Sequence, residues 1–250
     1  MPTKEKIKNF QYPDAIHRSY WDRRYQQEEW EVGPVTSKIG GGAAGGAAGD
    51  ENFLITPKTV LQYHILGTQS ITAPTAIAAG LDIGTMDQTS GDGLEINPGV
   101  LTSNPIAWKV GEDDAFFIRV RAMITTVAGT DDFAIGFRKQ EANQAAIDDY
   151  ADMAVINVIA GDIKTETIVG GAATVTTDTT DNWANLASKV VEIQVSSAGV
   201  VSYMVDGSEP TTVVDYTFTD ALTLIPFVYF LQNATKTVSL PITWECGFVS

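Results

Sequence analysis

One stretch constrains the fold more than any other, residues 189–210, KVVEIQVSSAGVVSYMVDGSEP. VVEIQV alternates apolar and polar residues, which is the two-residue period of a strand that is buried on one face. SSAG can turn, VVSYMV resumes the alternation, and the Asp-Gly pair at 206–207 can turn again. Because the pattern and the turn residues agree, the stretch predicts a β-hairpin.

The same pattern recurs through most of the chain, at a spacing of roughly ten residues. The predicted strands cover residues 52–56, 59–66, 76–86, 93–96, 115–126, 133–138, 154–159, 165–169, 173–177, 216–218, 222–231 and 237–249. We expect 115–126 and 133–138 to be hairpin partners, and 141–152 to be the one helix or long loop of the body. These spacings predict an all-β fold, an antiparallel β-sandwich (jelly roll), preceded by an extended N-terminal arm.

Several alternating strands also identify core faces. In residues 59–66, Leu61, Tyr63 and Ile65 share one face, and Gln62 and His64 share the other. In residues 237–249 the apolar face consists of Ile242, Trp244, Cys246 and Phe248. We therefore expect Cys246 to be a buried, inert thiol.

Composition excludes several classes of function. The chain has 250 residues and a formal net charge of −15, so nucleic acid is not an expected partner. Its single cysteine excludes an internal disulfide and any multi-cysteine metal site. The charged first residues predict no secretory signal, and no apolar run reaches the ~18 residues of a membrane helix. We expect the chain to be made and folded in a cytoplasm.

The N-terminal 39 residues differ from the rest, because they combine basic with aromatic residues. This composition is typical of interface anchors. The candidate partner-binding residues are Phe10, Tyr12, Arg18, Tyr20, Trp21, Arg23, Arg24, Tyr25 and Trp30. Two interpretations stay open: the arm packs on its own sandwich, or it docks on another subunit and becomes ordered there. Residues 40–49, GGGAAGGAAG, are a linker, which leaves 50–250 as the sandwich domain.

Around the hairpin the chain resembles concanavalin-A-like (laminin-G-like) jelly rolls. The resemblance lies in Trp183 and Leu186, the strand Val191–Val195, the turn glycine Gly199, and Tyr203–Gly207, which ends in aspartate–glycine. It implies a jelly roll over about residues 50–250. The layout of arm, spacer and acidic sandwich also resembles that of tailed-phage virion proteins, in which jelly rolls with long arms decorate a capsid.

No catalytic motif accompanies this resemblance. Members of the fold that hydrolyse glucans carry Glu-x-Asp-x-x-Glu or Glu-x-Asp-x-Glu on one strand, because they need two nearby carboxylates. Here the nearest strand offers only Glu192 followed by Gln194, so we expect no enzyme.

His17 and His64 lie in different segments and predict no metal pair. Acidic turns at 87–92, 112–114, 131–132 and 148–152 are expected to be solvated. A structural calcium ion is the alternative, and no cofactor is expected.

The leading hypothesis is a structural protein of a bacteriophage virion that decorates the capsid. The arm would anchor it to the major capsid protein, and a homo-oligomer such as a trimer is compatible with this role. The alternative is a glycan-binding, receptor-binding module of a tail or fibre, which would use a loop face of the sandwich. Trp108 or Trp183 could stack on a sugar there, but we expect both in the core.

Overall fold

The predicted hairpin is present in the computed structural model. β14 (Ser188–Val195) pairs antiparallel with β15 (Val201–Val205). Between them Gly199 has a φ of +85°, and a Cβ atom here would lie 2.6 Å from the carbonyl oxygen of Phe218. Only glycine fits both the left-handed conformation and this close approach.

The structure describes residues 25–30, 36–37, 52–55, 60–67, 75–77, 80–83, 91–99, 106–233 and 239–249. The other strands in these ranges are β1 (Gln26–Glu29), β2 (Thr36–Ser37), β3 (Asn52–Ile55), β4 (Val60–Leu66), β5 (Thr75–Ile77), β6 (Gly80–Asp82), β7 (Gly93–Asn97), β8 (Trp108–Lys109), β9 (Phe116–Ile124), β10 (Thr130–Lys139), β11 (Met153–Ile159), β12 (Asp162–Ile168), β13 (Val175–Asn182), β16 (Thr223–Gln232) and β17 (Ser239–Phe248). The helical elements of this described part are two 3₁₀ turns, η1 (Val127–Gly129) and η2 (Ile147–Asp149). It contains no helix that is long and apolar enough to cross a membrane.

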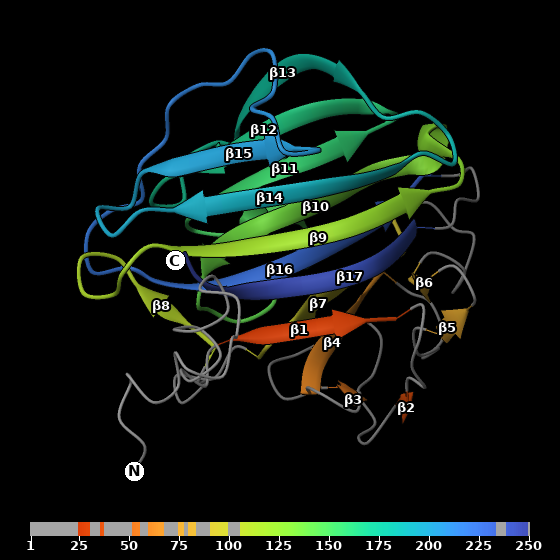
Figure 1. Ribbon diagram of the computed structural model, residues 1–250, viewed down its shortest axis with the longest axis horizontal. Coiled ribbons are helices and arrows are strands. Elements are labelled where there is room, and N and C mark those ends of the chain that lie inside the picture. The colour runs from red at the N-terminus through yellow and green to blue at the C-terminus, as the bar shows by residue number, and fades with distance from the viewer. Residues whose placement is uncertain are drawn as a thin grey trace, which may run out of the picture.

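The strands form two large antiparallel sheets. The five-stranded sheet has the order β1-β17-β9-β14-β15, and the ten-stranded sheet has the order β13-β12-β11-β10-β16-β7-β4-β3-β2, with β8 also paired to β16. β5 and β6 pair separately. In Figure 1 the five-stranded sheet lies in front of the ten-stranded sheet. The predicted all-β antiparallel sandwich is therefore confirmed.

Aromatic rings fill the core between the sheets. Trp108 stacks on Phe116 of β9 with ring centroids 5.2 Å apart, and Phe137 of β10 meets Phe116 edge-on at 5.0 Å. Because β9 and β10 belong to different sheets, these rings join the two layers. The expected core positions are buried as well, including Leu61, Tyr63, Ile65, Trp183, Ile242, Trp244, Cys246 and Phe248.

The hairpin expected between residues 115–126 and 133–138 is wrong. β9 pairs with β14 and β17, whereas β10 pairs with β11 and β16. The short turn η1 carries the chain from one sheet to the other. Two alternating strands that face each other across a core have the same apolar pattern as two neighbours in one sheet, so the pattern alone does not distinguish them.

Two further expectations are resolved. Residues 216–218 do not form a strand; Thr217 makes one isolated bridge with Val200, and the rings of Tyr216 and Phe218 pack together in the core. Residues 141–152, expected as a helix or a long loop, form a loop with the single turn η2.

Part of the expected arm belongs to the sandwich. β1 is the edge strand beside β17, and β2 pairs with β3. Trp30 is 2% exposed within the main core cluster, and its backbone N–H donates to the carbonyl oxygen of Ile242. The expectation that Trp30 contacts a partner is therefore corrected, because its apolar ring is buried by its own chain.

Candidate functional site

The outer face of the ten-stranded sheet is covered in its middle by the chain's own loop. Residues 140–152 cross this face, and Ile147 and Tyr150 pack on a second apolar cluster with residues from several strands. The strand members of this cluster are Leu66, Ala134, Met153, Val155, Ile168, Phe227 and Tyr229. The sheet is thus buried on both faces here, and the open part of the outer face lies beside the loop.

A buried ion pair fixes the loop. Arg138 points outward from β10, and its guanidinium donates to Glu95 of β7 at 2.7 Å and 3.0 Å. Both side chains are 0% exposed. Burial opposes the charged guanidinium, but Glu95 and the tyrosine beside it raise the pKa of Arg138 overall.

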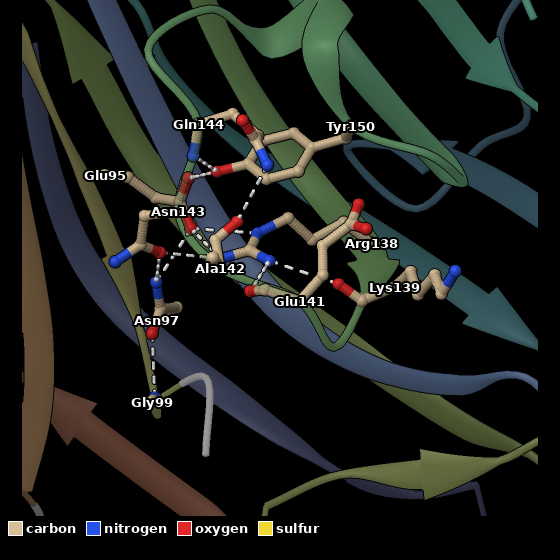
Figure 2. A network of polar contacts seen from close by, with 10 residues as sticks. All are labelled: Glu95, Asn97, Gly99, Arg138, Lys139, Glu141, Ala142, Asn143, Gln144 and Tyr150. Carbon is tan, nitrogen blue, oxygen red and sulfur yellow. Dashed lines mark hydrogen bonds and ion pairs between the residues drawn. The ribbon is translucent and has the colours of Figure 1, made fainter. Parts of the chain in front are cut away.

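Figure 2 shows how the loop closes around this guanidinium. Arg138 donates to the backbone carbonyl oxygens of Lys139 and Glu141 and to the side chain of Asn143. The Tyr150 hydroxyl donates to Glu95 and accepts from the backbone N–H of Gln144. Because every charged group has partners, the network is a structural clamp that holds the loop on the sheet.

Beside the clamp lies a cavity of about 740 Å³, which we call the outer-face cavity. Its walls come from β10, β11, β12 and β13, the turn η2 and β16. The lining residues are Asp131, Asp132, Ala146, Ile147, Asp148, Ile159, Glu166, Ala173, Thr174, Thr176 and Leu231. A β-bulge in β10 between Thr130 and Asp132 lies at its edge. Bulges commonly redirect side chains next to functional sites.

Asn157 organises the floor of the cavity. Its side-chain oxygen accepts from the backbone N–H of Phe133 at 2.9 Å, which fixes the amide orientation. Its side-chain nitrogen donates to Asp132 at 2.6 Å and to Glu166 at 2.8 Å. The Thr176 hydroxyl also donates to Glu166. One amide therefore bridges carboxylates from β10 and β12.

The carboxylates of this cavity form no salt bridge within the described part of the chain, although the charge of Lys164 on β12 partly offsets that of Glu166. No lysine or arginine of the described residues makes a salt bridge to Asp131, Asp132, Asp148 or Glu166. Burial, reinforced by the neighbouring carboxylates, raises the pKa of Asp132 to about 7. Burial also raises the pKa of Glu166. Asp132 is therefore partly protonated near neutral pH, and a cation placed beside it would favour its ionised form.

Most of the predicted partner-binding residues are outside the described residues: Phe10, Tyr12, Arg18, Tyr20, Trp21, Arg23 and Arg24. Tyr25 is described, and its hydroxyl donates to Glu245 of β17 at 3.0 Å. Glu192, weighed as a catalytic carboxylate, instead pairs with Arg119 on the five-stranded sheet. Trp108 and Trp183 are buried, so neither presents a ring to a sugar.

The outer-face cavity could not be recognised in the sequence. Residues 131–132 and 148–152 were expected to be separate solvated turns, whereas the fold brings Asp131, Asp132 and Asp148 together with Glu166. Asn157 could have indicated a buried polar site, because it is the one amide in the otherwise apolar strand MAVINVI. Such a residue in a strand buried on both faces needs polar neighbours.

Nothing in the described ranges is arranged as a metal site: they contain no group of three or more histidine, cysteine, aspartate or glutamate side chains that could hold a metal ion. His64 lies on β4, and His17 is outside these ranges.

Comparison with known proteins gives the fold. No family model matches the sequence, and no curated protein matches it. The potassium-bound carbohydrate recognition domain of Emp46p has a similar structure, with a TM-score of 0.54 and 6% identity, covering 75% of this chain and 89% of that one. A protein of unknown function from Shewanella oneidensis MR-1 has a TM-score of 0.51 and 13% identity, covering 100% of this chain and 95% of that one. The chain therefore shares an antiparallel β-sandwich fold with these proteins.

Proposed function

We propose that this chain is a non-catalytic glycan-binding module and that the outer-face cavity is its binding site. The observation that carries the proposal is a cavity of about 740 Å³ lined with hydrogen-bond acceptors beside apolar side chains. Glycans offer hydroxyl donors and apolar ring faces, so the lining is complementary to them. Support also comes from the fold, which resembles that of the carbohydrate recognition domain of Emp46p.

The proposed site differs from the one expected from sequence, which was a loop face with an exposed tryptophan. Both candidate tryptophans are in the core, whereas the cavity lies on a sheet face. The apolar contacts to a sugar ring would come from Ile147, Ile159 and Leu231.

Binding to a glycan array tests this proposal. We expect the wild-type chain to bind a restricted set of glycans, and Glu166→Gln to lose that binding, because the substitution removes a buried acceptor charge. Asp215→Asn changes the net charge equally at an exposed position and serves as the matched control. Failure to bind any glycan would reject the proposal. Release of new reducing ends from a bound glycan would reject its non-catalytic part.

The second candidate is the virion structural protein, and one observation favours it. β1 and Trp30 fix the end of the basic, aromatic segment to the edge of the five-stranded sheet. We propose that in this role residues 1–24 anchor the protein to the major capsid protein of a phage. The protein would then be located in the virion and could form a homo-oligomer such as a trimer.

Deletion of residues 1–24 tests the second candidate. It keeps every residue that the structure describes, so we expect the sandwich to stay folded. On this hypothesis the full-length chain binds capsids in many copies per particle and the truncated chain does not. Equal occupancy by both forms would reject the anchoring role.

A further inference from the structure

The outer-face cavity presents acceptors almost exclusively. The Thr174 hydroxyl donates its proton to Asp148 at 2.5 Å, and the Thr176 hydroxyl donates to Glu166 at 3.1 Å. The side-chain protons of Asn157 are used by Asp132 and Glu166. These three side chains thus donate to the cavity's own carboxylates, and a ligand that supplies donors would match the acceptors that remain.

Asp132 leaves the clearest open position. Only its Oδ1 atom receives a side-chain hydrogen bond, from Asn157, and no described residue donates to its Oδ2 atom. The charged groups near Asp132 are carboxylates, Asp131 on β10, Asp148 on η2 and Glu166 on β12, and the Tyr229 hydroxyl of β16 also lies nearby. A positive donor placed here would offset the repulsion among them.

The shape of the cavity favours an organic cation over a metal ion. Its volume lies within the roughly 300–1,000 Å³ that small-molecule sites occupy. Ile147, Ile159 and Leu231 form an apolar wall that a carbon skeleton could contact. Calcium requires six to eight oxygen ligands, and no cluster of the described side chains has a metal-holding arrangement.

We propose that the outer-face cavity binds an amino sugar, with the free ammonium group held by Asp132 and Glu166 and the ring against the apolar wall. This inference rests on the glycan-binding function proposed above and specifies its ligand class. An ammonium group has three donors and a positive charge, which match the acceptors and the charge of the cavity.

Isothermal titration calorimetry near neutral pH tests the inference with three matched oligosaccharides. They are the glucosamine pentamer, the N-acetylglucosamine pentamer and cellopentaose, which differ at the amino position. We expect the glucosamine pentamer to bind at least about tenfold more tightly than the other two. Asp132→Asn and Glu166→Gln should each weaken its binding at least about tenfold, while Asp215→Asn should not.

The other outcomes overturn the inference in distinguishable ways. If the acetylated and neutral pentamers bind as tightly as the amine, the ammonium site is rejected but glycan binding stands. If no pentamer binds and the array is also blank, both proposals fail. If pentalysine binds and the glucosamine pentamer does not, the cavity is a site for basic side chains and the amino-sugar assignment is rejected. Equal weakening by Asp215→Asn would indicate non-specific attraction to an acidic protein and would also reject it.

Discussion

At the scale of single residues, Asn157 shows how one side chain can organise a site. It lies on β11, its oxygen is held by a backbone N–H of β10, and its nitrogen bridges Asp132 and Glu166. The two carboxylates therefore keep fixed positions although they belong to different strands. Such preorganisation lets a site bind without spending free energy on ordering its own groups.

The raised pKa of Asp132 predicts a pH-dependent stability. Its pKa is about 7 in the folded protein, against an ordinary value of 3.8, so the folded state binds the proton more tightly than the unfolded state. The free energy of unfolding should therefore fall as pH rises from about 4 to about 7. Asp132→Asn should remove this loss and stabilise the protein at pH 8 by about 2–4 kcal/mol, measured by urea unfolding.

Below about pH 3 the wild-type protein and Asp132→Asn should have similar stability, because Asp132 is then protonated in both states. Asp215→Asn is the control, since Asp215 is exposed. A stability gain for Asp132→Asn that is the same at every pH would contradict the assignment to a buried carboxyl group.

The Arg138–Glu95 clamp predicts a strong asymmetry between single and double variants. Arg138→Met leaves the Glu95 charge buried without its partner, which should cost about 3–5 kcal/mol of unfolding free energy. Adding Glu95→Gln should recover much of this loss, because the uncompensated charge disappears. A double variant that is less stable than Arg138→Met would show that the charge is not the cause. Chemical denaturation of the three proteins makes the comparison.

At the scale of strands, local patterns predicted what depends on neighbours in sequence. The hairpin β14–β15 has its alternation and its turn residues within one stretch, so both could be identified. The face carrying Trp244 and Cys246 on β17 was likewise predicted from a two-residue period. These features need no knowledge of distant strands.

Other features could not be predicted because they depend on the sheet to which a strand belongs. Phe116 and Phe137 are both apolar inward positions, whether their strands pair or face each other across the core. Glu166 joins Asp132 only because β12, β11 and β10 are consecutive in one sheet. Trp30 was expected to need a partner, because nothing in its sequence showed that β17 would offer an edge for β1.

Trp30 provides a prediction about strand β1. Because its ring is buried in the core, Trp30→Ala should lower the free energy of unfolding by about 3–5 kcal/mol. Tyr25→Phe removes a half-buried hydroxyl that bonds to Glu245 and, at 3.4 Å, to Gln27, and it should cost about 1 kcal/mol or less. Equal stabilities of Trp30→Ala and the wild-type protein in urea unfolding would contradict the packing of β1 on the sandwich.

At the scale of the whole molecule, the two faces of the ten-stranded sheet have different roles. The inner face supplies the core of the sandwich, and the outer face carries the loop clamp and the cavity. The five-stranded sheet instead presents a surface of paired charges, such as Arg119 with Glu192 and Glu245. The outer-face cavity therefore differs from the five-stranded sheet, because its carboxylates form no salt bridge with any residue that the structure describes.

The central claim is that ligands bind in the outer-face cavity, and mapping amide chemical shifts during a titration with the glucosamine pentamer tests it most directly. We expect the largest shifts at the amides around Asp132, Asn157 and Thr176, with little change on the opposite sheet around Arg119 and Glu192. Shifts concentrated on the five-stranded sheet or at the hairpin turn around Gly199, with the cavity amides unchanged, would contradict the account.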